Sequence, residues 1–196
     1  SKKDSITTKQ ANSNKLFTPS EVLLGGGAFC PTTSLLFEKE AVLNLPQWYD
    51  DAPFGDFILQ IFGSLKGGAL YIDRPMSVYR RNATGSWSVA MLNIENKEQE
   101  LQRLLETYDA MDGHFNQRFH SEILQIKSDL YLEMALSYLL NDNIIKFKQT
   151  IEECYSFSEK KSKKLLLSYH LRNWPTLLKG IVKLYKKLDK YIIFKG

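Results

Sequence analysis

Apolar residues in the second half of the chain recur with the three- and four-residue spacing of amphipathic helices. The segments with this spacing are KEQELQRLLETYDAM, SEILQIKSDLYLEMALSYLL, IIKFKQTIEECYSF, KKSKKLLLSYHL and PTLLKGIVKLYKKLDKYII. The breaks between them, at Gly113, at residues 141–143 and at Trp174-Pro175, are short, as expected for helices that pack antiparallel to their neighbours. The pattern predicts a bundle of about five helices over residues 94–196.

The first half of the chain has shorter elements separated by glycine and proline. TPSEVLLG predicts a helix that begins with a capping box, with Thr18 at the N-cap and Glu21 three residues later. TTSLLF, ALYI and MSVYR have the composition of short strands. EKEAVLNLP predicts a brief helix, and the run from Asp56 to about Lys66 predicts a longer one.

The predicted fold class is α/β and predominantly helical, with two or three short strands followed by the helical bundle. So few strands make a poor sheet unless other strands pair with them or helices cover them, so the sheet is expected to be unfinished. Three parts follow along the chain: a loose polar lead-in over residues 1–17, a region of short elements over 18–93, and the helical region over 94–196.

Composition supports an ordinary globular protein. The 196 residues are 43% hydrophobic and 24% charged, enough for one sizeable domain or two small ones. Cys30 and Cys154 match no metal-binding or redox spacing and are interpreted as small core residues in a reducing compartment. The sequence contains neither a signal peptide nor a long apolar run, so we expect a cytoplasmic protein.

The C-terminal region is rich in lysine, within a net charge of +4 for the whole chain. Its last predicted helix has an apolar stripe made of Leu177, Leu178, Ile181, Leu184, Tyr185, Leu188 and Ile192. The lysines at positions 179, 183, 186, 187 and 190 lie largely off that stripe. This pattern indicates a helix packed on its neighbours with a solvated lysine face; the alternative is that residues 176–196 lie on an anionic membrane surface. Nucleic acid is not an expected partner, because no recognition motif accompanies the charge.

Asp56 is the candidate catalytic residue. An aspartate just before an apolar helical run most often caps the helix, which stabilises the protein by about 1 kcal/mol. A carboxylate at a helix N-terminus is also stabilised as the anion and is ready to accept a proton at neutral pH. Trp48 and Tyr49 precede it on a loop and offer aromatic faces on which a sugar ring can stack. Arg80 and Arg81 end a predicted strand and are suited to phosphate or carboxylate oxygens.

Two consecutive segments resemble the second half of the catalytic domain of family 2 glycosyltransferases, which have the GT-A type nucleotide-sugar transferase fold. They are TPSEVLLGGGAFCPTTSLLFEKEAVLNLPQWYDD and GDFILQIFGSLKGGALYIDRPMSVYRRNATGSWS, in the order of that family. The resemblance covers about residues 18–88. It implies that residues 18–93 are the acceptor-side remnant of such a domain and that the strands belong to a partial GT-A type sheet.

The resemblance implies a role for each matching residue. Asp56 would be the general base that takes a proton from the acceptor hydroxyl. Trp48, Tyr79, Arg80 and Trp87 would shape the acceptor and diphosphate side of the cleft.

The resemblance also implies a divalent cation, Mg²⁺ or Mn²⁺, in the intact enzyme. Asn82 occupies the position of the histidine that often helps to hold that ion, so no metal ligand is predicted within this chain. No acidic D-x-D motif or nucleotide-binding half precedes Asp56. Since the chain also begins at Ser1 without methionine, we expect the C-terminal part of a longer enzyme, inactive on its own.

The expected function is an inverting transfer of sugar from a nucleotide-diphosphate donor to a carbohydrate or lipid-linked acceptor, in bacterial cell-surface polysaccharide synthesis. The enzyme would be cytoplasmic or peripheral to the inner face of the membrane. The alternative is a non-catalytic helical module for protein interaction or membrane-surface binding that retains a remnant of the transferase.

Overall fold

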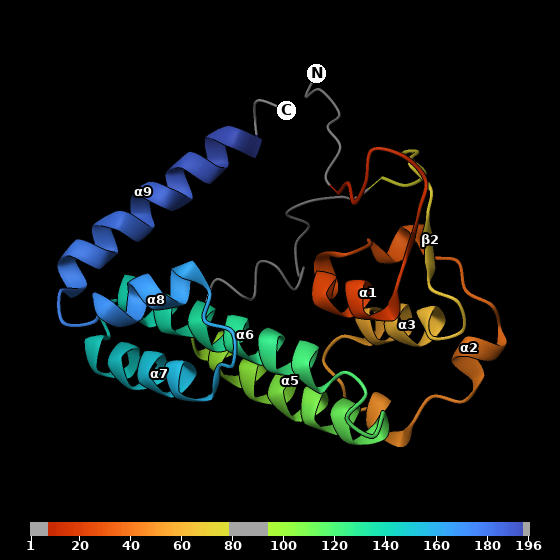
Figure 1. Cartoon of the computed structure of the whole chain (residues 1–196), viewed down its shortest axis with the longest axis horizontal. Helices are drawn as coiled ribbons and strands as arrows, with labels where there is room; N and C mark the ends of the chain where they lie inside the picture. Colours follow the sequence, from red (N-terminus) through yellow and green to blue (C-terminus); the bar gives the residue numbers. More distant parts are fainter. Residues whose placement is uncertain (1–7, 79–93, 194–196) are drawn as a thin grey trace. The chain divides into compact units, whose positions relative to one another are not determined.

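The computed structural model describes residues 8–78 and 94–193 (Figure 1). Within these residues the chain is predominantly helical, as predicted, and it has one two-stranded antiparallel sheet. The helices of the first half are α1 (Pro19–Gly25), α2 (Glu40–Leu43) and α3 (Gly55–Ser64). The predicted helices of the second half are confirmed as α5 (Ile94–His114), α6 (His120–Leu140), α7 (Ile144–Phe157), α8 (Lys163–His170) and α9 (Pro175–Ile193).

The contacts of the chain define two compact units. The first unit comprises residues 1–92 and 102–123, and the second comprises residues 93–101 and 124–196. The helix α5 therefore contributes its first residues to the second unit and its remainder to the first. The predicted three-part division of the chain stays a prediction.

The capping box at the start of α1 is confirmed. The Thr18 hydroxyl accepts a hydrogen bond from the Glu21 backbone N–H at 3.2 Å, and the Thr18 N–H donates to Glu21 Oε2 at 2.8 Å. Lys15 Nζ lies 2.9 Å from Glu21 Oε1. The capping box fixes where α1 begins. Val22 and Leu23 of this helix are fully buried in the core of the first unit.

The sheet contains one strand that was predicted and one that was not. The strand β2 (Ala69–Tyr71) confirms the prediction for ALYI. Its partner is β1 (Lys15–Phe17), which pairs with it in antiparallel register, Leu16 opposite Leu70. The lead-in predicted over residues 1–17 is therefore wrong at its end, because a three-residue strand has too little alternation to be read without its partner.

The strand predicted in TTSLLF is wrong. The structure has a short 3₁₀ turn at Thr32–Ser34 and no strand after it, and Leu36 is 98% exposed. Strand composition alone does not make a strand where no neighbour supplies the ladder hydrogen bonds. The described part of MSVYR, residues 76–78, is also not a strand, and the rest of that prediction lies outside the described residues.

The helix α3 is the centre of the first unit. It packs against α1, α2, β2 and the 3₁₀ turn Gly26–Ala28. Phe57, Ile58 and Ile61 lie on its buried side, and each such side chain contributes about 1.5–3 kcal/mol through burial. Phe57 meets the ring of Tyr108 from α5 edge-to-face, with centroids 6.0 Å apart. The apolar spacing of FILQIF therefore decides which side of α3 faces inward.

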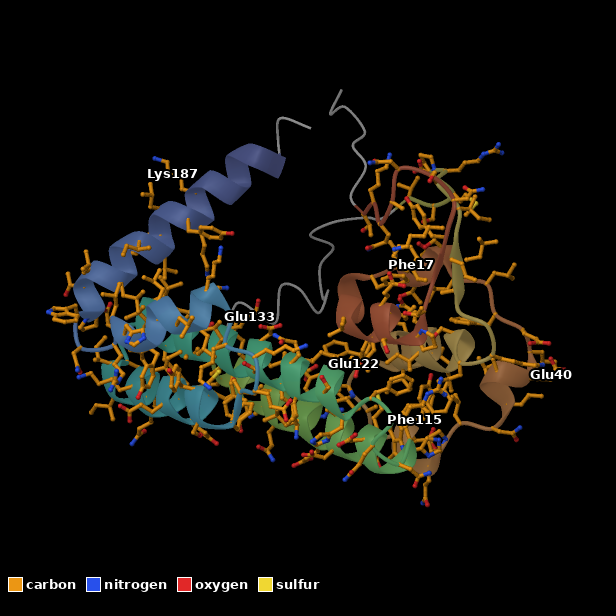
Figure 2. All side chains as sticks on the ribbon, viewed as in Figure 1. Phe17, Glu40, Phe115, Glu122, Glu133 and Lys187 are labelled. Atoms are coloured by element: carbon orange, nitrogen blue, oxygen red, sulfur yellow. The ribbon has the colours of Figure 1, made fainter. Side chains whose placement is uncertain are left out.

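Other aromatic rings of the first unit gather at the turn after α5. Phe115 lies in this turn (Figure 2) and contacts Phe62 and Phe119, with centroids 5.4 Å away in both cases. The contacts of Phe62, Phe115 and Phe119 therefore pack α3 against the turn between α5 and α6.

The second unit has its own core, formed by α6, α7, α8 and the start of α9. The fully buried side chains include Phe147, Ile151, Leu165 and Leu178. Cys154 is buried with them, as predicted, and burial raises the pKa of its thiol.

Among the described residues, no helix combines the length and the apolar character needed to cross a membrane.

Replacement of Gly68 by alanine should destabilise the first unit. Gly68 has φ +92°, and a Cβ there would collide with the backbone oxygen of Phe17, which cannot move without breaking the sheet. We expect Gly68→Ala to lower the free energy of unfolding by roughly 2–3 kcal/mol, measured by chemical denaturation. Gly113→Ala is the control, because a Cβ on α5 there meets nothing within 4 Å. Equal effects of the two substitutions would contradict this account.

The capping box should make stability depend on pH. The Thr18 N–H and then Lys15 hold the pKa of Glu21 at about 2, against an ordinary value of 4.5. Because the folded-state pKa is the lower one, the stabilisation is complete above pH 4.5 and is lost as pH falls toward 2. Glu21→Gln should flatten the fall in unfolding free energy across this window, while Glu40→Gln, outside any capping box, should leave its slope unchanged.

Candidate functional site

Asp56 lies in the first turn of α3, as its second residue. The helix begins at Gly55, one residue before the predicted start, and the N-cap is Phe54, which makes no side-chain capping hydrogen bond. Asp56 is therefore not the N-cap residue that the capping alternative predicted, although its carboxylate accepts a hydrogen bond from a backbone N–H of the first turn. Its carboxylate still lies at the end of the helix where unpaired N–H groups and the helix dipole favour a negative charge.

Two hydrogen bonds hold the Asp56 carboxylate. The Thr32 hydroxyl donates to Oδ2 at 2.5 Å, and the Phe57 backbone N–H donates to Oδ1 at 2.8 Å. Thr32 lies 24 residues earlier, in the 3₁₀ turn Thr32–Ser34. Residues of the PTTS and GDF segments, on which the family resemblance depends, thus lie in contact.

A second hydrogen bond links the same two segments one helical turn later. Gln60 Nε2 donates to the backbone oxygen of Cys30 at 3.2 Å. Gln60 is only 4% exposed, although it lies within an otherwise apolar run. Inside the linked segment, the Ser34 hydroxyl donates to the oxygen of Pro31 at 2.8 Å. The loop of residues 30–34 is therefore bound to α3 at two positions one helical turn apart.

The aromatic residues before α3 pack closely. The Tyr49 hydroxyl lies 2.8 Å from the point where a Cβ of residue 55 would stand, so Gly55 allows this approach. The Trp48 ring lies 6.3 Å from Phe62 and 6.1 Å from His114, measured between centroids. Its buried Nε1 finds no hydrogen-bond acceptor among the described residues. Trp48 thus contributes to the packing of the first unit, and its predicted role in binding sugar stays a prediction.

The other predicted site residues, Tyr79, Arg80, Asn82 and Trp87, lie outside the described residues. The described ranges contain no cluster of three or more His, Cys, Asp or Glu side chains that could hold a metal ion.

Sequence reasoning missed the two residues that organise the neighbourhood of Asp56. Thr32 was interpreted as part of a strand, and its contact with Asp56 spans too much sequence to be read from local spacing. Gln60 did offer a signal, because a polar residue on the apolar side of a helix needs a buried partner. These two side chains connect the loop to α3.

The groups with shifted pKa lie on other helices. Burial raises the pKa of Tyr108, which packs on Phe57. In the second unit, Lys146 and then Tyr138 hold the pKa of Glu98 below its ordinary value, and the Glu98–Lys146 ion pair measures 2.7 Å. Burial and then the Glu98 carboxylate raise the pKa of Tyr138. These pKa shifts result from burial and from ion pairs between side chains of different helices.

No protein-family profile, curated protein or solved structure matches this chain.

The contact between Thr32 and Asp56 should be measurable as a coupling energy. In a double-mutant cycle with Thr32→Val and Asp56→Ala, which removes the acceptor oxygen, we expect about 1 kcal/mol of interaction in the free energy of unfolding. Thr33→Val in place of Thr32→Val is the matched control and should show no coupling to Asp56. A coupling of zero for Thr32 would contradict the observed hydrogen bond.

Proposed function

We propose that this chain carries the acceptor-side part of an inverting, family 2-like glycosyltransferase with a GT-A type fold. The intact enzyme moves a sugar from a nucleotide-diphosphate donor to a carbohydrate or lipid-linked acceptor in cell-surface polysaccharide synthesis. It works in the cytoplasm or at the inner face of the membrane. The observation that carries the proposal is the hydrogen bond from Thr32 to Asp56, which joins two segments whose order resembles that of the family.

In the proposed reaction Asp56 is the general base. The acceptor hydroxyl oxygen attacks the anomeric carbon of the donor, and its proton passes to the Asp56 carboxylate. The bond from the anomeric carbon to the diphosphate oxygen breaks, and the nucleoside diphosphate leaves with the electron pair. A single displacement inverts the anomeric configuration.

The contacts of Asp56 suit this role. A carboxylate has about four lone-pair positions, and the Thr32 hydroxyl and the Phe57 N–H occupy two of them. No other hydrogen bond to this carboxylate is seen among the described residues, and we propose that a substrate hydroxyl binds at a remaining position.

The donor side of the proposed cleft depends on residues beyond those described. Tyr79, Arg80 and Trp87 are proposed to face the diphosphate and the acceptor. The divalent cation implied by the resemblance does not fit the described side chains, which offer no suitable cluster of ligands.

A second candidate is a non-catalytic helical module that keeps a remnant of the transferase. It is favoured by the separate core of the second unit and by apolar side chains exposed on α9. In that case Asp56 would be a structural residue, holding Thr32 in place. The two candidates differ in whether Asp56 affects turnover.

Replacement of Asp56 by asparagine in the intact gene product should abolish sugar transfer. Asparagine keeps the size and one acceptor oxygen but cannot take the proton, so we expect kcat to fall at least about 100-fold. Transfer is measured as release of nucleoside diphosphate. Asp51→Asn is the control, because Asp51 is an exposed aspartate of the preceding loop and should leave kcat unchanged.

A thermal melt accompanies the kinetics. The expected change in melting temperature for Asp56→Asn is a few degrees, from the weakened hydrogen bond to Thr32. Full turnover by the Asp56→Asn enzyme would remove this residue from the mechanism and favour the non-catalytic module.

A further inference from the structure

The helix α9 exposes apolar side chains along one side. Leu177, Leu184 and Tyr185 are 57%, 60% and 60% exposed, and Trp174, just before the helix, is 61% exposed. Positions three, seven and eight residues apart share one side of a helix. We name these four residues the α9 strip.

The packing of the first turns of α9 sets the direction of the strip. Leu178 is fully buried in the core of the second unit. Lys179 Nζ donates to Asp142 Oδ1 at 2.6 Å, and this contact lowers the pKa of the Asp142 carboxyl. These two contacts fix the rotation of the helix about its axis. Tyr185 lies seven residues after Leu178 and therefore on the same side of the helix, but it is 60% exposed because this part of α9 extends beyond the core that Leu178 enters.

After its first turns, α9 no longer runs along α8. Figure 1 shows it diverging from α8 as it runs toward its C-terminal end. Lys183, Lys186 and Lys187 are exposed on this part, and Figure 2 shows Lys187 pointing away from α8. Lysines outnumber acids on α9, which has Lys179, Lys183, Lys186, Lys187 and Lys190 against Asp189, and the exposed Asp142 pairs with Lys179.

We propose that α9 binds an anionic lipid surface, with the α9 strip entering the interfacial region and the neighbouring lysines reaching the lipid phosphates. Leucine, tryptophan and tyrosine are the residues that enter such an interface favourably. Lysine side chains are long enough to keep the ammonium group at the headgroups while the backbone lies deeper. A strip of four residues on a positive helix supports weak, reversible binding that depends on lipid charge.

Charge complementarity selects the membrane over a protein partner. A protein groove for this helix would need acidic residues placed opposite several separate lysines, whereas an anionic bilayer supplies negative charge over its whole surface. The membrane proposal therefore explains the apolar strip and the excess of lysine together.

Vesicle co-sedimentation tests the proposal with the chain of residues 1–196. The probes are vesicles of pure phosphatidylcholine and vesicles that contain phosphatidylserine as well. We expect at least about tenfold tighter binding to the anionic vesicles, weakened by added salt. Absence of binding to either kind of vesicle would overturn the proposal.

The contribution of the strip is tested with Leu184→Ser/Tyr185→Ser. This variant should bind anionic vesicles at least about tenfold more weakly, because it loses apolar contact with the lipid. Its control is Ile145→Ser/Leu167→Ser, which removes two exposed apolar residues from α7 and α8. An equal loss of binding in the control would overturn the assignment to α9. All four positions are exposed, so we expect both variants to keep the fold, and circular dichroism verifies it.

The contribution of the lysines is tested with Lys183→Gln/Lys186→Gln/Lys187→Gln. A second triple variant, with glutamine at positions 160, 163 and 164, removes the same charge near and within the start of α8. We expect the α9 triple to lose at least about tenfold in affinity for anionic vesicles and the second triple to lose several-fold less. Equal losses would mean attraction by net charge alone and would overturn the proposal.

Two further measurements distinguish lipid binding from self-association and from catalysis. Concentration-dependent self-association that Leu184→Ser/Tyr185→Ser abolishes, without any vesicle binding, would assign the strip to a second copy of the chain and overturn the membrane proposal. Asp56→Asn should bind vesicles as the unmodified chain does, so the result is independent of the proposed catalytic function.

Discussion

The first unit depends on the pair of side-chain hydrogen bonds that α3 makes with residues 30–34, the loop between α1 and α2. This loop has no ladder partner, so its polar backbone must find partners in local turns and in side chains. Gln60 supplies a buried donor to the oxygen of Cys30, and Asp56 accepts the hydroxyl of Thr32. Because the same helix packs on α1, α2 and β2, these two bonds attach the loop to the core. The position of Asp56 and its surroundings follow from that attachment.

The charge of Asp56 is compatible with both structure and chemistry. In the first turn of α3 it faces unpaired N–H groups, and the Thr32 hydroxyl adds a further donor. A structural carboxylate would use the same contacts. A general base needs, in addition, free lone pairs that a substrate hydroxyl can reach, and the two observed hydrogen bonds leave such positions. The chemistry therefore depends on what binds beside α3, and the proposed donor side belongs to residues beyond those described.

The second unit shows how one helix can serve two purposes. Leu178 anchors the buried side of α9 in the core. The ion pair of Lys179 with Asp142 also holds the start of the helix in place. Val182 also packs against that core, whereas Leu177, Leu184 and Tyr185 stay exposed. Exposed leucine and aromatic side chains cost little on a folded surface when isolated, but gathered on one side of a basic helix they form a binding surface. The anchoring of the first turns and the exposure of the strip are thus two consequences of the same amphipathic sequence.

The sequence by itself determined the elements whose signals are local. The capping box at Thr18 and the helices of the second half follow from residues three or four positions apart, so spacing is enough to find them. It also identified Asp56 as the carboxylate in the first turn of a helix. Only the tertiary structure decided that Thr32 lies in a 3₁₀ turn on Asp56, that β1 pairs with β2, and which side of α9 is buried. Strand pairing and side-chain contacts of this kind join residues far apart in the chain. They stabilise the protein only after the core has brought those residues together, so local spacing does not reveal them.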